Sequence, residues 1–421
     1  MLSVVVLLAT VTGVLVATDK RGEASAGGGV VTQTVTVPAS SDPYGKPTDV
    51  YTPSSTPAST TSEAPTSANG SSSEAPTSES DAPTQPAGRP VSNIPMTKLA
   101  PGAKPPQFVI FSFDGAGNSA KMHEFMDTAK SVNARFTGFL SGTYLLEDAN
   151  ADVYQAPGAN RGASDVGFGG DATEVTQRIN DLNQMYAMGN EIGTHYNGHF
   201  CGLGANWSTA QWDNELDQFF NIFSNWKTIN GLTDAPDLQI PVSEVKGGRT
   251  PCLSDIWNQV NPAWKDHGMT YDSSQPGPRD GIYWPQRVDG VWEFYMPLVY
   301  SAGLGGKVTA MDYNFWVKFN GAKNDPASAS VLTPKVLDTY RYMYNQAFNG
   351  NRAPVLIANH FNDWNGNSFN PATDQFMKET CARPDTYCAT YQDVIAWMQL
   401  QDPAVLANLQ SLPSVAYQPA S

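Results

Sequence analysis

Short apolar segments alternate with segments of helical periodicity from about Pro105 to the end of the chain, and this alternation limits the fold more than any other feature. The segment 107–113 (QFVIFSF) is typical of a buried strand. The segment 172–188 has an apolar residue every three or four positions, as in an amphipathic helix, and Gly189 follows it. Alternating strands and helices build mostly parallel sheets. We therefore predict an α/β domain whose sheet forms either a barrel or an open sheet.

The same criteria place the remaining elements along the chain. The predicted strands are 107–113, 135–140, 191–194, 242–246, 292–296, 307–311 and 354–359. The predicted helices are 119–130, 172–188, 207–229, 253–267, 334–348 and 392–400.

The N-terminal part of the chain has a different composition and is expected to have a different role. Residues 2–18 are almost entirely apolar, which is long enough for the core of a signal peptide and slightly short for a membrane span. Lys20 and Arg21 follow this run instead of preceding it, so residues 1–26 are predicted to be either a cleaved signal peptide or a retained membrane anchor. Both alternatives imply export, to an extracellular or cell-surface location.

Residues 27–95 are rich in Ser, Thr, Pro, Ala and Gly, and the sequence SEAPTS occurs twice. Such a segment buries too little apolar surface to offset its ordering entropy, so we predict a disordered linker. A short Val and Thr alternation at 30–37 has the pattern of a strand without a visible partner. The predicted organisation is thus a leader (1–26), a linker (27–95) and a catalytic domain (96–421).

The charge and the cysteine content bear on which partners the protein can bind and on whether its cysteines form disulfides. The net charge is −15, without the clustered Lys and Arg that phosphate contacts require, which argues against a nucleic-acid partner. No amphipathic or heptad segment implies a protein partner. Four cysteines allow three disulfide pairings, of which we expect Cys201–Cys252 and Cys381–Cys388. A cysteine-ligated zinc site is the alternative, although the sequence lacks a CxxC pair.

Five polar residues with catalytic potential follow predicted strands, and parallel strands bring their carboxyl ends to one edge of a sheet or one face of a barrel. Taken singly, each has an ordinary structural explanation such as a turn, a cap or an ion pair. Three of the five histidines fall at these strand ends, whereas His123 and His267 lie in predicted helices. The five residues are Asp114, His195, His199, Arg249 and His360.

The chemistry that suits these groups is metal-assisted hydrolysis. Two neutral imidazoles and a carboxylate form a zinc site with positions left for water and substrate. A bound divalent metal, most suitably zinc, lowers the pKa of water and polarises a carbonyl. A carboxylate base and a histidine acid would then move the protons, and an adjacent arginine would keep the base ionised.

The motifs around these residues resemble those of the NodB-type polysaccharide deacetylases, carbohydrate esterase family four. Ser112-Phe113-Asp114-Gly115 is similar to the family's T-F-D-D-G, and His195-Tyr196-Asn197-Gly198-His199 is similar to its H-[ST]-x-x-H. Arg249-Thr250-Pro251 corresponds to R-x-P, and the strand ending at His360 is loosely similar to the last motif, Leu-x-His. The similarity extends from about Gln107 to the last predicted helix.

The resemblance implies a distorted (β/α) barrel that removes N-acetyl or O-acetyl groups from polymers. It also implies that His195 and His199 bind the metal, Asp114 is the base, Arg249 orients it and His360 is the acid. We further assign substrate contact to Trp364, Asp363 and Pro251. The other aromatic candidates for a sugar-stacking groove, for each of which core packing is the more common role, are Trp207, Trp212, Tyr283, Trp284 and Trp292.

One departure from the family pattern concerns the metal. The second Asp of the first motif, normally a ligand, is replaced by Gly115. Asp114 could then become the ligand itself, which would remove it as a free base. The substitutes that the sequence offers are Asp171, Asp272 and Asp363.

These features give three functional hypotheses. The first is a metal-dependent deacetylase acting on a polysaccharide, with an N-acetylated amino-sugar polymer such as peptidoglycan or chitin favoured. The second is a carbohydrate-binding or wall-associated protein that has the same fold without turnover, motivated by Gly115. The third is an unrelated metal-dependent hydrolase on a similar barrel.

Overall fold

The structure, a computed structural model, describes residues 90–100 and 102–420. The predicted leader, and the linker apart from its last residues, lie outside this range, and so does the Val and Thr alternation at 30–37. None of the described helices is both long enough and apolar enough to span a membrane.

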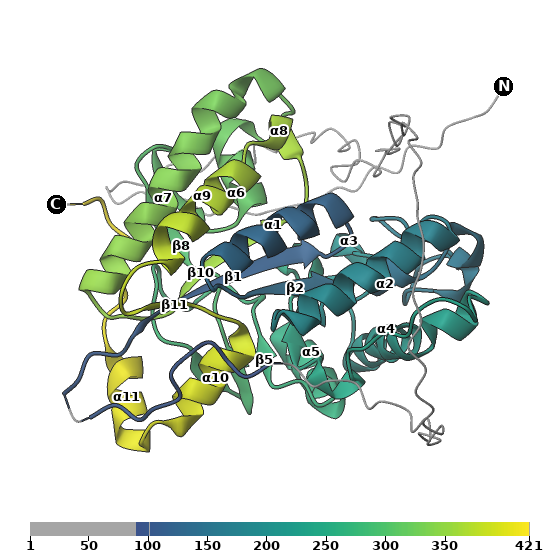
Figure 1. Ribbon diagram of the computed structural model, residues 1–421, viewed down its shortest axis with the longest axis horizontal. Coiled ribbons are helices and arrows are strands. Elements are labelled where there is room, and N and C mark those ends of the chain that lie inside the picture. Colours follow the sequence, from purple (N-terminus) through teal and green to yellow (C-terminus); the bar gives the residue numbers. More distant parts are fainter. Residues whose placement is uncertain (1–89, 101, 421) are drawn as a thin grey trace, which may run out of the picture. The chain divides into compact units, whose positions relative to one another are not determined.

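A nine-stranded, mainly parallel sheet forms the centre of the domain (Figure 1). Its main order is β10-β1-β2-β3-β4-β5-β7-β6; β11 pairs with β1, and only the β6–β7 pair is antiparallel. Because β10 and β6 end this order, the (β/α) barrel is distorted rather than fully hydrogen-bonded around its circumference. The strands are β1 (Gln107–Gly115), β2 (Phe136–Leu140), β3 (Glu191–Thr194), β4 (Gly247–Gly248), β5 (Tyr271–Asp272), β6 (Gln286–Val288), β7 (Val291–Glu293), β10 (Val355–His360) and β11 (Thr386–Cys388). A separate hairpin consists of β8 (Leu298–Ser301) and β9 (Gly306–Thr309).

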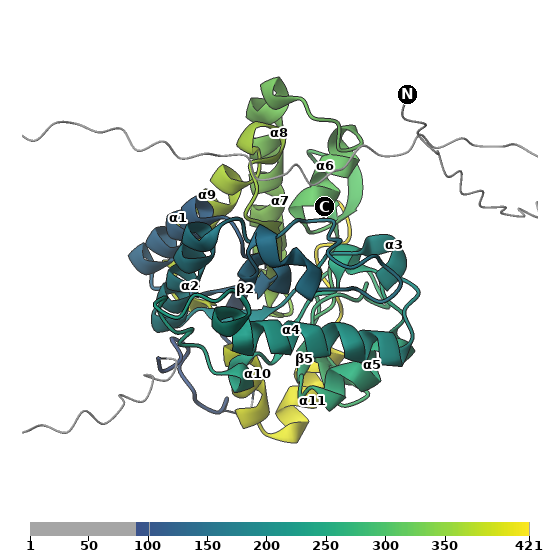
Figure 2. The ribbon, with the colours of Figure 1, turned by 90° about the vertical axis from the view of Figure 1, so that its right-hand side faces the viewer.

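Helices pack around this sheet. Helix α1 contacts α2 and α9, and α7 packs against α9 (Figure 1), while α4 and α5 lie side by side (Figure 2). The helices are α1 (Ser119–Ser131), α2 (Ala172–Ala187), α3 (Cys201–Gly204), α4 (Thr209–Ile229), α5 (Trp257–Asp266), α6 (Asp312–Asn320), α7 (Ala329–Asn349), α8 (Trp364–Asn367), α9 (Asn370–Cys381), α10 (Tyr391–Leu400) and α11 (Pro403–Ser411).

Local sequence explains the best-predicted elements. Strand β1 is an almost continuous apolar run and its first eight residues are buried, as expected of a central strand of a parallel sheet. Helix α2 begins at a capping box in which Asp171 accepts from the backbone of Glu174 and Glu174 accepts from that of Asp171. It ends before Gly189, whose φ of +87° is in the left-handed region.

The predicted strand at 242–246 is wrong. Val242–Glu244 forms a 3₁₀ turn, and the strand is the following pair, Gly247–Gly248. A Cβ atom on Gly248 would lie 2.0 Å from the carbonyl oxygen of Thr194 on β3. Only glycine permits so close an approach of the two strands, so the strand occurs where the apolar pattern is weakest.

Other elements also differ from the sequence predictions. The strand predicted at 307–311 exists as β9 but pairs only with β8, outside the main sheet. Helix α7 begins at Ala329, five residues before Pro334, which is accommodated inside the helix. Helix α11 follows the helix that was predicted to be the last.

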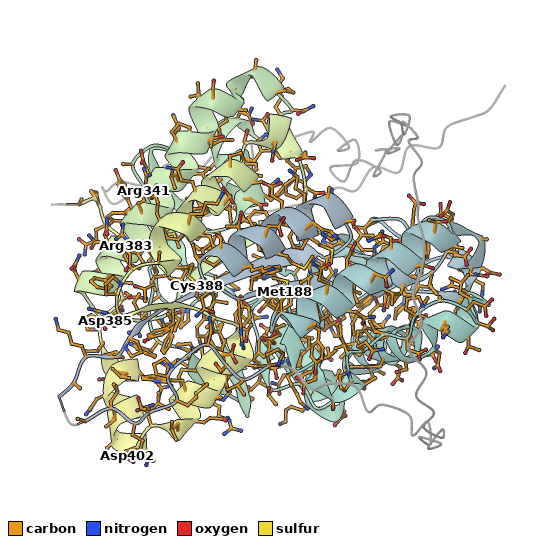
Figure 3. The ribbon with its side chains drawn as sticks, viewed as in Figure 1. Met188, Arg341, Arg383, Asp385, Cys388 and Asp402 are labelled. Carbon is orange, nitrogen blue, oxygen red and sulfur yellow. A yellow bond between two sulfur atoms is a disulfide. The ribbon has the colours of Figure 1, made fainter. Side chains whose placement is uncertain are left out.

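Both expected disulfides are confirmed. Cys201 is bonded to Cys252 with a Cα–Cα distance of 5.5 Å, which connects α3 to the turn after β4. Cys381 is bonded to Cys388, labelled in Figure 3, and connects the end of α9 to β11.

Candidate active site

The strand register brings the predicted residues to the carboxyl edge of the sheet. Asp114 on β1 is the register partner of His360 on β10. Thr194 on β3 pairs with Gly248 on β4, so His195 and Arg249 leave the sheet side by side. The convergence predicted from the sequence is therefore present in the fold.

Arg249 is fully buried and fixed by several hydrogen bonds. Its Nη1 donates to Asp114 Oδ1 at 2.7 Å, and its Nε donates to the carbonyl oxygen of Ser273 at 2.8 Å. The guanidinium also lies over the ring of Phe139, 4.8 Å from its centroid. Nη2 donates to the hydroxyl oxygens of Ser112, Ser273 and Tyr391. The hydrogen bond from Arg249 fixes Oδ1 of the Asp114 carboxylate, and the other oxygen, Oδ2, faces His360.

The Asp114 carboxylate is 4% exposed and nevertheless remains ionised at neutral pH. Burial raises its pKa, but the opposing effects, of which the charge of Arg249 is the largest, outweigh burial, so the pKa lies below its ordinary value. Asp114 Oδ2 lies 3.8 Å from His360 Nε2. A buried carboxylate that stays ionised beside an imidazole is suited to accept a proton.

Asp312, the first residue of α6, orients His360. Its Oδ1 lies 2.8 Å from His360 Nδ1, and its Oδ2 accepts from the backbone N–H of His360, also at 2.8 Å. Burial lowers the pKa of His360, but the charge and hydrogen bond of Asp312 and the charge of Asp114 raise it above the ordinary value. Because Nδ1 donates to the carboxylate of Asp312, Nε2 is the nitrogen that lies toward Asp114.

Sequence reasoning missed Asp312, although a signal was present. It comes directly after the strand predicted at 307–311, at the same kind of position as Asp114. Its partner His360 lies 48 residues away in sequence, so only the tertiary fold pairs them.

His195 and His199 form a pair of buried, neutral imidazoles whose ring centroids are 4.9 Å apart. His195 Nδ1 lies 2.8 Å from the carbonyl oxygen of Arg249, which only accepts, so Nδ1 carries the proton. Its Nε2 is buried without a hydrogen-bond partner. Burial, together with the charges of His360 and Arg249, lowers the pKa of His195 to about 4 despite the charge of Asp114. Burial, followed by the charges of His195 and His360, holds the pKa of His199 well below its ordinary value.

This pair fits a divalent metal such as zinc. A neutral imidazole with an unpartnered, buried Nε2 is the donor that zinc requires, and the Arg249 carbonyl fixes its tautomer as a metal-bound histidine needs. Among the described residues, one group of three donors lies close enough to share an ion: His199, Cys201 and Cys252. The two cysteines are joined in a disulfide and offer no thiolate. Asp114 does not form such a group with the two histidines.

The three acids considered as substitute ligands have other partners. Asp171 caps α2, and Asp272 accepts from the backbone and hydroxyl of Ser274. Asp363 is exposed and forms an ion pair with Lys121 at 3.0 Å. At Gly115, a Cβ atom would lie 3.6 Å from the ring of Tyr144. Among the described residues, no carboxylate forms a three-donor group with the two imidazoles in this conformation.

Of the aromatic residues predicted to contact a sugar, Trp364 is the one that lies beside His360. Its ring centroid is 4.6 Å from that of His360, and it is half-buried, so part of the ring stays open to solvent. It packs against Tyr313 and Trp316 of α6. Pro251 is buried at the start of the 3₁₀ turn after Arg249. The other aromatic candidates are core residues rather than a sugar-stacking groove, because each is at most 9% exposed; they are Trp207, Trp212, Tyr283, Trp284 and Trp292.

The fold and site together define an α/β protein with a buried aspartate and histidine beside two neutral imidazoles at the carboxyl edge of its parallel strands. Similar solved structures include a candidate polysaccharide deacetylase from Mycobacterium smegmatis, 17% identical, with a TM-score of 0.42 over 78% of this chain and 100% of that one. A family 4 carbohydrate esterase from Streptomyces lividans, in complex with acetate, is 13% identical, with a TM-score of 0.32 over 67% and 91%. A family 4 pseudoenzyme from Bacillus anthracis is 11% identical, with a TM-score of 0.33 over 68% and 65%. The last two are proteins of family 4, the family that the motifs resemble. No family model and no curated protein matches the chain.

Proposed function

We propose that this protein is a metal-dependent hydrolase that removes acetyl groups from a polysaccharide, with an N-acetylated amino-sugar polymer such as peptidoglycan or chitin favoured. The observation that carries the proposal is the buried pair of Asp114, ionised by Arg249, and His360, held by Asp312, beside two neutral imidazoles. A base, an acid and a metal-binding pair are the three components that hydrolysis of an acetyl amide or ester requires.

The proposed roles follow from the atoms that remain free. Asp114 Oδ2, the oxygen not bonded to Arg249, takes the proton of the attacking water. His360 Nε2 donates a proton to the departing amine or alcohol. His195 and His199 hold the metal, which when bound polarises the acetyl carbonyl and acidifies water. Asp114, also considered as a metal ligand, suits the role of base better because it forms no three-donor group with the two histidines.

The surroundings of the site support a carbohydrate substrate outside the cytoplasm. The half-buried ring of Trp364 beside His360 offers a face for a sugar ring, and Asp363 and Pro251 flank the site on the loops after β10 and β4. Two disulfides favour an oxidising compartment, in agreement with the leader predicted at 1–26.

The alternative is a carbohydrate-binding protein that has this fold but no turnover. Gly115 favours it, because it stands where the first motif of the resembled family has its second Asp, which is normally a metal ligand. Release of acetate from a polymer distinguishes the proposed enzyme from this alternative, and from a hydrolase of another specificity.

Metal content is the first test. Purified protein incubated with zinc and desalted is expected to retain about one equivalent, and the double variant His195→Ala, His199→Ala to retain none, because both imidazole donors are lost. Elemental analysis measures this directly. If the unaltered protein takes up no divalent metal, the hydrolytic mechanism is wrong and the binding protein becomes the better hypothesis.

Replacing Asp312 with asparagine is expected to lower kcat at least about tenfold and to move the alkaline limb of the pH–rate profile to lower pH. The Asp312 charge raises the pKa of His360, so the variant loses the protonated acid earlier as pH rises. Acetate release measured from pH 5 to 10 checks both effects. Asp402→Asn, at an exposed ion pair with Lys98, is the control that leaves the profile in place.

A further inference from the structure

The loop between the two histidines has an unusual backbone. Tyr196 and His199 both have positive φ, +57° and +60° respectively. Residues other than glycine rarely occupy this region, at a cost of about 1 kcal/mol or more each, so the surrounding structure must hold them there. The side chain of Tyr196 is buried and packs on Trp212 and Trp264, which anchors one side of the loop.

A buried carboxylate on α4 holds the other side. Glu215 is 1% exposed, and its Oε1 accepts from the backbone N–H of Asn197 at 3.1 Å and from Asn197 Nδ2 at 3.0 Å. The hydroxyl of Tyr154 donates to Oε1 at 2.9 Å and accepts from the backbone N–H of Gly198 at 3.1 Å. Two consecutive backbone amides between the histidines are thus fixed on Glu215, one directly and one through Tyr154.

We propose that Glu215 is a positioning residue for the histidine pair: its carboxylate fixes the loop so that His199 faces His195 in the geometry that a metal ion requires. This inference rests on the proposed metal site. The hydrogen-bond partners of Glu215 named above are all neutral, and burying a carboxylate without a cation is costly. A carboxylate is required because it only accepts, whereas an amide would turn an N–H₂ group toward one of the three donors.

A matched variant separates positioning from general stability. Glu191, at the start of β3, is also 1% exposed and also accepts from a tyrosine hydroxyl, that of Tyr271 at 2.6 Å. It also accepts from the backbone and side chain of Gln392. Glu215→Gln and Glu191→Gln therefore each remove one buried carboxyl group with a similar set of partners, but only the first touches the histidine loop.

Two measurements on the full chain test the proposal. Zinc affinity, from competition with a chromophoric chelator, is expected to fall about 10- to 100-fold in Glu215→Gln, the usual effect of losing a group that orients metal ligands. Amide hydrogen exchange of the metal-free protein is expected to be at least about tenfold faster at Asn197 and Gly198 in the same variant. Glu191→Gln is expected to lower the melting temperature without either change. If Glu215→Gln does not fold, Tyr154→Phe serves as a milder substitution in its place. This variant is expected to show faster amide exchange at Gly198.

The outcomes distinguish this inference from the proposed function. If the unaltered protein binds no zinc, the proposed function fails, while amide exchange still decides whether Glu215 holds the loop. Unchanged zinc affinity and unchanged exchange in Glu215→Gln would overturn the inference. Equal changes in Glu191→Gln would also overturn it, because they would show a loss of general stability only.

Discussion

Replacing Asp114 with asparagine is expected to lower kcat for acetate release by about 10²–10⁴-fold, the range for loss of a general base, while zinc content stays unchanged. The amide has nearly the same shape and can still bond to Arg249, but it cannot take a proton from water. Acetate release and elemental analysis on the same preparation measure the two quantities.

The zinc content of the Asp114→Asn variant decides whether Asp114 is the base or a metal ligand. Its Oδ1 is bonded to Arg249 and its Oδ2 lies near His360, and it forms no three-donor group with the histidines. If the asparagine variant lost zinc together with activity, Asp114 would be a metal ligand and the base would have to be another group. His360→Gln, which removes the proposed acid, serves as the companion variant that should also retain zinc.

Replacing Arg249 with methionine is expected to lower the free energy of unfolding by about 3–5 kcal/mol at pH 7, because it leaves the buried Asp114 charge without its cation. Urea unfolding measures the loss. Arg341→Met, at the half-exposed ion pair with Glu379 on α9, is the control (Figure 3) and should change stability by about 0.5 kcal/mol or less.

The loss of unfolding free energy in Arg249→Met should become smaller as the pH falls. In the unaltered protein the pKa of Asp114 is lowered, so its contribution to stability is present above the unfolded pKa and disappears as pH falls through the folded value. Without Arg249, burial raises the pKa of Asp114 instead. The deficit of the variant is therefore greatest near neutral pH and shrinks in acid. Arg249→Met, Asp114→Asn should recover part of the lost stability, and a double variant no more stable than the single one would contradict this explanation.

The sequence predicted the parts of the site that depend on strand ends. Each of four site residues lies at the end of an apolar run or of a strand with parallel neighbours: Asp114, His195, Arg249 and His360. Parallel strands bring such residues to the same carboxyl edge of the sheet, independently of how the side chains pack. The disulfide between Cys201 and Cys252 followed from the same reasoning, since both cysteines lie just beyond these motifs. Their catalytic and metal-binding roles stay predictions until the variants are measured.

A prediction failed where the local sequence pattern did not show which neighbouring strand the segment must contact. The apolar segment 242–246 has the composition of a strand, but the contact with Thr194 requires the glycines that follow it. Trp212 and Trp284 were candidates only, because core packing is the more common role of a Trp in a domain of this size, and both are fully buried.

By itself, the sequence determined the alternation of strands and helices, the edge at which the reactive side chains gather, and the cysteines that pair. Only the tertiary structure decided which groups hold those side chains: Asp312 for His360, and Glu215 with Tyr154 for the histidine loop. The physical reason is the separation along the sequence of the residues that determine each feature. Periodicity and strand ends depend on neighbours a few residues apart, whereas a hydrogen bond between Arg249 and Asp114, 135 residues apart, depends on how the whole sheet packs.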